Sequence, residues 1–129
     1  MSLVKTLPKH NDDVCSIAFS PDSKHLATGN GDGVIRIWDT NNWNCINTLK
    51  EHSGSINSLD YSLNGMYLAS GSEDNQIKIW TINTSVLESC SRLRQRESNS
   101  SYKCEKIVSG YKDCICSVSF SPDSKLLAC

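Results

Sequence analysis

The chain repeats itself, and this repeat constrains the fold more than any other feature of the sequence. A shift of 42 residues superposes two segments, and a further shift of 59 residues begins a third, less complete copy. The matched segments are His10 with His52, Leu26–Gly29 with Leu68–Gly71, Asp32 with Asp74, Ile35–Trp38 with Ile77–Trp80, and Phe19–Asp22 with Phe120–Asp123. A fixed period of this length predicts similar units that each need a neighbour to bury an apolar face.

Within each copy, apolar side chains tend to occupy alternate positions, as in 14–19 and 56–61, and β-branched and aromatic residues are frequent. This period of two is typical of half-buried strands. Turn-forming residues follow both segments, at 20–24 and at 63–65. We therefore expect an all-β protein with four strands in each copy: 14–20, 25–29, 34–38 and 44–49, then 56–62, 67–71, 76–82 and 104–108.

The combination of motifs resembles the WD40 repeat. The first copy carries Lys9-His10, Leu26-Ala27-Thr28-Gly29, Asp32 and Ile35-Arg36-Ile37-Trp38-Asp39, and a second runs from Glu51-His52 to Trp80. The resemblance implies a partial β-propeller with two full four-stranded blades, an N-terminal outer strand over 2–7 and half of a third blade. The repeat region then covers 1–129, with repeat 1 at about 7–48, repeat 2 at about 49–82, an insertion loop at 83–103 and a partial repeat 3 at about 104–129.

The resemblance also implies a hydrogen-bonded network inside each blade. Its members are His10, Thr28, Asp32 and Trp38 in the first blade, and His52, Ser70, Asp74 and Trp80 in the second. An imidazole, a hydroxyl, a carboxylate and an indole N–H can satisfy one another when buried. A hydroxyl, an imidazole and a carboxylate also suggest a nucleophile and its base, but the group recurs at the same repeat position beside a tryptophan. We therefore predict a structural role, no catalytic residue and no enzyme.

The third copy departs from the pattern, with Tyr111 at the histidine position and Cys129 at the serine or threonine position. Cys114 and Cys116 fall on one face of a predicted strand, and no second pair of ligands follows them at metal-binding spacing. We expect no metal and no cofactor, and we expect Cys116, which aligns with Cys15, to be a small packing residue.

Charge and composition restrict the partners. With 13 basic and 14 acidic residues, the sequence offers no electrostatic reason to bind nucleic acid or an anionic membrane. Acidic Asp12, Asp13 and Glu73 fall in loops at one end of the predicted blades, which favours a basic peptide as ligand. Seven cysteines without a secretory leader are typical of reduced thiols in a cytoplasmic or nuclear protein.

The sequence thus predicts a non-catalytic scaffold that binds other proteins or peptides. A propeller needs about four to eight blades, so we expect the missing blades to come from the rest of a longer chain, of which this sequence is a fragment. The segment 5–14 is also similar to the start of WD-repeat, SAM and U-box proteins. The alternative is therefore the substrate-targeting propeller of a multidomain protein such as a U-box ubiquitin ligase, whose catalytic part lies elsewhere.

Overall fold

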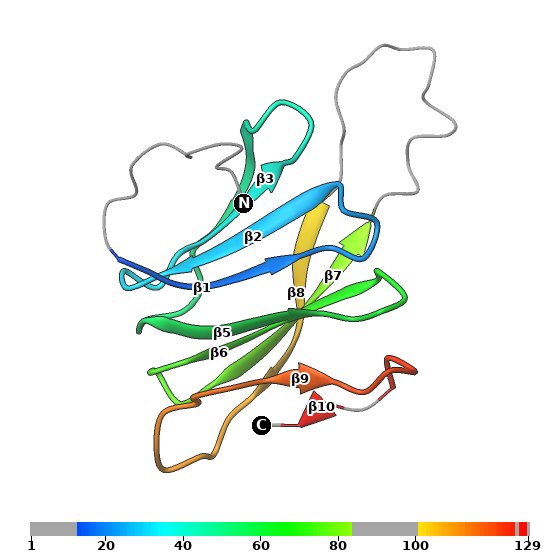
Figure 1. Ribbon diagram of the computed structural model, residues 1–129. Coiled ribbons are helices and arrows are strands. Elements are labelled where there is room, and N and C mark those ends of the chain that lie inside the picture. Colours follow the sequence, from blue (N-terminus) through cyan, green and yellow to red (C-terminus); the bar gives the residue numbers. More distant parts are fainter. Residues whose placement is uncertain (1–12, 84–100, 126, 129) are drawn as a thin grey trace, which may run out of the picture.

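The computed structural model of this chain describes residues 13–83, 101–125 and 127–128, and it is built from β-strands joined by turns (Figure 1). The predicted all-β class is confirmed. The strands are β1 (Val14–Phe19), β2 (His25–Asn30), β3 (Ile35–Asp39), β4 (Cys45–Leu49), β5 (Ile56–Tyr61), β6 (Tyr67–Ser72), β7 (Ile77–Asn83), β8 (Ser101–Val108), β9 (Ser119–Phe120) and β10 (Leu127–Ala128).

Two antiparallel sheets of four strands follow the order of the chain. Strands β1 to β4 form the first sheet, here called blade one, and β5 to β8 form the second, blade two. Strands β9 and β10 begin a third sheet. The registers of the two blades repeat as the sequence does, since Ala18 pairs with Ala27 in blade one and Asp60 pairs with Ala69 in blade two. Each blade is therefore a meander of short hairpins.

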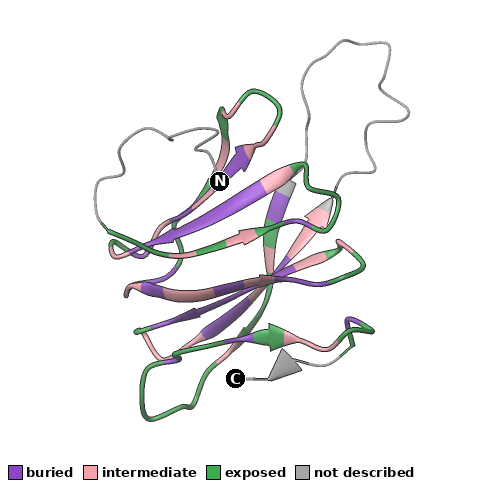
Figure 2. Ribbon diagram, in the orientation of Figure 1, coloured by how far each residue is buried: buried purple, intermediate pink, exposed green. Residues whose placement is uncertain are grey.

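The blades stack face to face, so that β1 lies beside β5 and β5 lies beside β9 (Figure 1). One core lies between blade one and blade two, and a smaller core lies between blade two and the third repeat (Figure 2). Neighbouring residues of one strand serve different cores, because Leu68 belongs to the first and Ala69 to the second. This alternation is the period of two read in the sequence.

The stacking repeats one contact. Ile56, Leu59 and Tyr61 of β5 are at most 7% exposed against blade one. Their equivalents in the third repeat, Ile115 and Val118, are 6% and 4% exposed against blade two. In the first repeat the equivalents are solvent-exposed: Val14 at 45%, Ile17 at 59% and Phe19 at 56%. In the second and third repeats, this face of the first strand packs against the preceding blade. In the first repeat the same face of β1 is exposed.

Glycine makes the close contact between blades possible. A Cβ atom built on Gly71 would lie 2.6 Å from Cγ2 of Ile115, and one built on Gly29 would overlap the side chain of Ile56. Both glycines stand at the same position of the repeat, in the second strand of their blades. The missing side chain lets the isoleucine of the next blade reach the backbone.

Some expectations about boundaries and strands were wrong. The insertion expected at 83–103 is shorter among the described residues, because Asn83 pairs with Ser101 and the β7–β8 ladder continues through 103. The polar composition misled the prediction, since backbone hydrogen bonds in a ladder do not depend on apolar side chains. The expected N-terminal strand over 2–7 and residues 84–100 lie outside the described part.

The segment around Cys114 and Cys116 is not the strand that was expected, because β9 starts only at Ser119. The segment is held by side chains of β5: Asn57 Nδ2 donates to the Ile115 carbonyl, and the Val118 N–H donates to Ser58 Oγ. Cys116 is exposed, as is its equivalent Cys15, so the packing role expected for Cys116 was also wrong. Side-chain bonding replaces the ladder that the alternation predicted.

We predict that Gly29→Ala lowers the free energy of unfolding of the chain by about 1–3 kcal/mol, because the added methyl group overpacks against Ile56. Urea denaturation followed by tryptophan fluorescence measures the change. Thr48→Val, at an exposed position on β4, is the control and should shift stability by less than about 0.5 kcal/mol. Equal stability of the Gly29→Ala variant and the parent would contradict the proposed contact.

Candidate functional site

Four side chains of blade two form a continuous hydrogen-bonded chain. Nδ1 of His52 lies 2.8 Å from Oδ2 of Asp74, and its Nε2 lies 2.7 Å from Oγ of Ser70. The indole N–H of Trp80 donates to the same Oγ at 3.0 Å. The four residues come from the loop before β5, from β6, from the turn after β6 and from β7. The fold thus brings together the four residues that the repeat singled out in this blade.

The hydrogen-bond partners of Asp74 and His52 determine which atoms of this network carry protons. Asp74 also accepts hydrogen bonds from the Ser53 and Gln76 N–H groups, so its carboxylate stays ionised and accepts a hydrogen bond from the Nδ1–H group of His52. Nε2 of His52 then carries no proton and accepts a hydrogen bond from the hydroxyl group of Ser70. Burial lowers the pKa of His52 despite the neighbouring carboxylate, which keeps the ring neutral. Burial alone would raise the pKa of Asp74, but hydrogen bonds from His52 and from the Ser53 N–H outweigh it and hold the pKa below its ordinary value.

The order of Asp74, His52 and Ser70 is that of a nucleophile with its base and acid, yet its surroundings are those of a core. Ser70 is fully buried. Its oxygen already accepts the Trp80 N–H while its proton is held by His52, so no substrate atom can approach the hydroxyl. The arrangement ties three elements of blade two together.

Blade one repeats part of this arrangement. The Trp38 N–H donates to Oγ1 of Thr28 at 3.1 Å. Asp32 accepts the Val34 N–H and forms an ion pair with Arg36 at 3.6 Å. The fourth expected member, His10, lies outside the described residues. The described part of blade one therefore brings together Trp38 with Thr28, and turns the Asp32 carboxylate toward Arg36.

The third repeat has Tyr111 at the histidine position, and this side chain is exposed; Cys129 lies outside the described part. No group of three or more histidine, cysteine, aspartate or glutamate side chains is placed to hold a metal ion within residues 13–83, 101–125 and 127–128. Over the same ranges, no helix is long and apolar enough to cross a membrane.

The acidic loop residues lie at one end of the blades. Asp13 directly precedes β1 and Glu73 directly follows β6, and both are exposed. The Gly31 N–H donates to the Asp13 carbonyl and the Glu73 N–H donates to the Ser55 carbonyl, so the backbone of each exposed residue is held in place. Asp12 lies outside the described residues. We call this end, defined by Asp13 and Glu73, the acidic end.

Sequence reasoning found no polar cluster beyond the repeated network, and the structure contains one. Nδ1 of His25 lies 3.0 Å from the Tyr102 hydroxyl, which lies 2.8 Å from the Tyr61 hydroxyl. Both tyrosines are buried, and burial raises the pKa of each above its ordinary value, so both stay protonated. A signal existed, because Tyr61 stands where the other two copies have Phe19 and Phe120.

Comparison with known proteins gives one family. The model of the WD domain, G-beta repeat, matches residues 1–39, 43–81 and 102–129. Among curated proteins, the chain is similar to the protein Notchless of Drosophila melanogaster, 50% identical over 36 residues, and to the anaphase-promoting complex subunit cdc20 of Dictyostelium discoideum, 44% identical over 41 residues. The U3 small nucleolar RNA-associated protein 18 homolog of Arabidopsis thaliana is 46% identical over 44 residues.

These matches are local. They cover 28%, 32% and 34% of this chain, and only 7%, 8% and 8% of the three relatives in the same order. The chain therefore resembles a small part of each relative, about one repeat long.

We predict that Ser70→Ala destabilises the chain by about 1–3 kcal/mol for each group it strands, here Nε2 of His52 and the Trp80 N–H. Ser53→Ala is the control, because that side chain is exposed. In a double-mutant cycle with Trp80→Phe, the two costs should be strongly non-additive, since both variants remove one bond. Additive costs would mean that the two side chains act independently.

We also predict that the network loses stability toward acid. The pKa of His52 in the folded chain lies below its ordinary value of 6.5, so the unfolded chain binds more protons below about that pH and is favoured there. Asp74, whose pKa is also depressed, adds a second loss of stability below its ordinary pKa of 3.8. Urea titrations between pH 5 and 8 should show stability falling below pH 6.5 in the parent and falling less steeply in His52→Gln. Equal pH slopes in the two proteins would contradict this.

Proposed function

The chain belongs to the WD40 repeat family, and from that premise we propose that it is a non-catalytic scaffold that holds other proteins or peptides on a rigid stack of blades. The observation that carries this proposal is the use of the repeated polar residues. Asp74, His52, Ser70 and Trp80 bond to one another inside blade two, so the polar groups that suggest chemistry serve the architecture. The surface that remains for partners is made of loops on a rigid frame.

The acidic end supports a more specific form of the proposal. Asp13 of the first repeat and Glu73 of the second are exposed at the same end of neighbouring blades, and Asp12 precedes Asp13 in the sequence. Two or three carboxylates there attract a basic peptide and raise its rate of encounter. The carboxylates contribute charge, while the fixed backbones beneath them contribute shape.

The matched part of the chain spans less than a tenth of the length of the relatives described above. We therefore propose that the partners of the whole protein also depend on residues outside this chain. The exposed Val14, Ile17 and Phe19 of β1 support the proposal that a further WD40 blade covers this face, supplied by the rest of the protein. The alternative of a targeting propeller in a U-box ubiquitin ligase depends on residues 5–14, most of which lie outside the described part. It remains a prediction from the sequence.

We predict that charge reversal at the acidic end weakens partner capture several-fold. Asp12→Lys, Asp13→Lys and Glu73→Lys would be made singly and together in the full-length product, which is then affinity-purified from cells and its partners quantified by mass spectrometry. Glu105→Lys, on the outer strand β8, changes the charge as much as each single reversal but on another surface, and it should leave recovery unchanged. The same partner profile for the triple variant and the parent would count against this end as the binding surface.

A further inference from the structure

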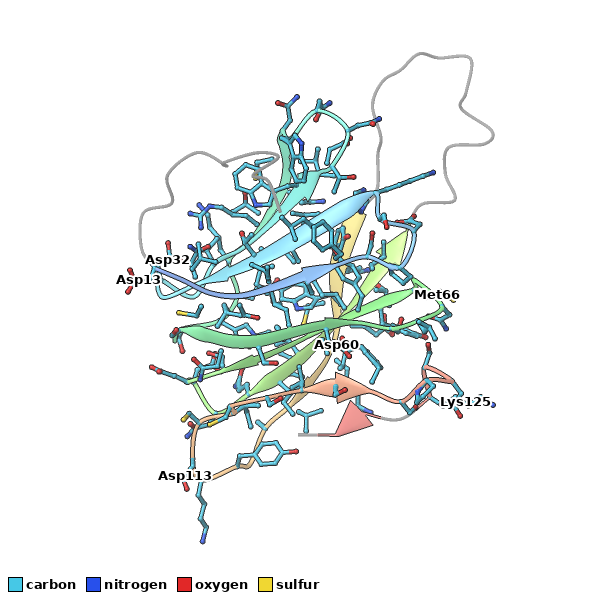
Figure 3. All side chains as sticks on the ribbon, in the orientation of Figure 1. Asp13, Asp32, Asp60, Met66, Asp113 and Lys125 are labelled. Atoms are coloured by element: carbon cyan, nitrogen blue, oxygen red, sulfur yellow. The ribbon has the colours of Figure 1, made fainter. Side chains whose placement is uncertain are left out.

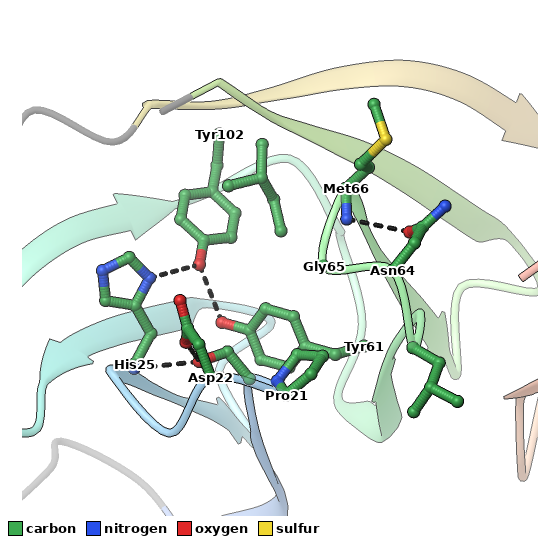
Figure 4. A pocket seen from close by; sticks show the side chains of 11 residues that line it. Pro21, Asp22, His25, Tyr61, Asn64, Gly65, Met66 and Tyr102 are labelled. Carbon is green, nitrogen blue, oxygen red and sulfur yellow. Dashed lines mark hydrogen bonds between the residues drawn. The ribbon is translucent and has the colours of Figure 1, made fainter. Parts of the chain in front are cut away.

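A cavity of about 680 Å³ opens between blade one and blade two at the end opposite the acidic end. Its lining comes from the turn between β1 and β2, from the turn between β5 and β6, and from the ends of β7 and β8 next to them (Figure 4). In Figure 3, Asp13 and Met66 lie at opposite ends of the strands, which mark the two ends of the blades. A six-residue strand separates the ends by about 20 Å. Because both blades that line the cavity are present, it is not the open face of an unpaired blade.

The cavity contains the polar cluster of His25, Tyr61 and Tyr102. The corresponding place between blade two and the third repeat is closed differently. There Tyr67 replaces His25 and Phe120 replaces Tyr61, and the two rings stack with centroids 6.4 Å apart. Repetition therefore explains the stack of blades and does not explain this cluster.

The turn between β5 and β6 is also specialised. The equivalent turns of the first and third repeats both read Ser-Pro-Asp-Ser-Lys, at 20–24 and 121–125, whereas this one reads Ser-Leu-Asn-Gly-Met at 62–66. The backbone shape is kept, because Ser23, Gly65 and Ser124 share a left-handed φ of 64°, 75° and 64°. The exchange replaces proline and lysine by Leu63 and Met66, which are 64% and 55% exposed at the cavity. Two large apolar side chains on the rim suit an apolar partner surface.

Asp22 supplies the charge. Its Oδ1 accepts the Ser20 hydroxyl at 2.6 Å and the Lys24 N–H at 3.0 Å, which fixes the carboxylate at the cavity, and Figure 4 shows it between His25 and Tyr61. Burial would raise its pKa, but these hydrogen bonds outweigh burial and keep it ionised. Burial also lowers the pKa of His25, which is therefore neutral. Lys24 belongs to the same turn and its charge reaches Asp22, but it does not line the cavity, so the lining itself carries one negative charge.

From this combination we propose that the cavity binds a cationic side chain, arginine or lysine, of a partner peptide whose neighbouring apolar side chains rest on Leu63 and Met66. A carboxylate next to two phenol rings is a suitable receptor for a guanidinium or ammonium group. A volume of about 680 Å³ is large enough for one such side chain, and the exposed Leu63 and Met66 on the rim extend the contact to its neighbours. This site is distinct from the acidic end, and it deepens the proposed scaffold function by naming a second peptide-binding surface.

The test compares labelled peptides on the full chain. The probe is a fluorescein-labelled pentapeptide with a central arginine flanked by leucines, and its partner carries citrulline, which has the same shape without the charge. Fluorescence anisotropy should give saturable binding of the arginine peptide and roughly tenfold weaker binding of the citrulline peptide, since a charge-assisted hydrogen bond is lost. A version of the arginine peptide with serines in place of the leucines should bind the parent more weakly than the leucine version does. The Met66→Ser variant should bind this serine version as weakly as the parent does.

Asp22→Asn is the decisive variant, and the chain supplies its own evidence that the fold accepts it. Asn64 occupies the equivalent position in the second repeat and accepts the same two hydrogen bonds, from the Ser62 hydroxyl and from the Met66 N–H. Asp22→Asn should abolish the preference for arginine over citrulline. Asp123→Asn, in the equivalent turn of the third repeat, removes the same charge away from the cavity and should leave the preference intact.

Three results would overturn the proposal: equal affinity of the parent for the two peptides, equal effects of Asp22→Asn and Asp123→Asn, or no saturable binding of the arginine peptide up to millimolar concentration. Glu73→Lys distinguishes this proposal from the acidic end. If the cavity binds the peptide, that variant leaves peptide affinity unchanged even where it abolishes capture of cellular partners. A negative result for one of the two binding surfaces can therefore still be interpreted separately from the result for the other.

Discussion

The insertion of one isoleucine into the glycine gap of the preceding blade holds the structure together. Ile56 enters beside Gly29 and Ile115 enters beside Gly71, so each blade is seated on the one before it. The contact is directional, because one blade gives a side chain and the other gives a gap. Directional contacts of this kind extend in one dimension, and stability grows with each interface that forms. The core of this chain accordingly lies between blades and not within any one of them.

Once the blades are seated, the polar network of blade two has a clear physical task. Trp80 and His52 bring N–H groups and a ring nitrogen into the core, where unpaired polar atoms cost free energy. Ser70 resolves this by accepting from one and donating to the other, and Asp74 closes the chain at the surface. The network therefore fixes the loop that carries His52 to the strand that carries Trp80. Loops anchored in this way present partner-binding residues on a rigid frame.

The sequence predicted most of this because the information was periodic. Alternating apolar residues located seven of the eight strands of the two blades to within one residue, and β8 begins three residues before its expected start. A repeated offset located the members of the network in blade two. Prediction failed where local composition and backbone bonding disagree. The polar residues at 101–103 pair in β8, whereas the alternating residues at 114–118 do not pair in a strand, because side chains of β5 hold them. Side-chain bonding across blades leaves no periodic signal.

The cavity between the first two blades shows what a repeat can hide. A repeat is found by what its copies share, and that comparison sets aside the positions at which one copy differs. Tyr61 differs from the two phenylalanines by one oxygen, and the turn carrying Leu63 and Met66 differs from two identical turns. These differences lie around one cavity because the equivalent turns of neighbouring blades are at the same end of the blades. In a scaffold built from copies, the shared residues make the frame, and specificity for a partner has to come from the positions at which the copies differ.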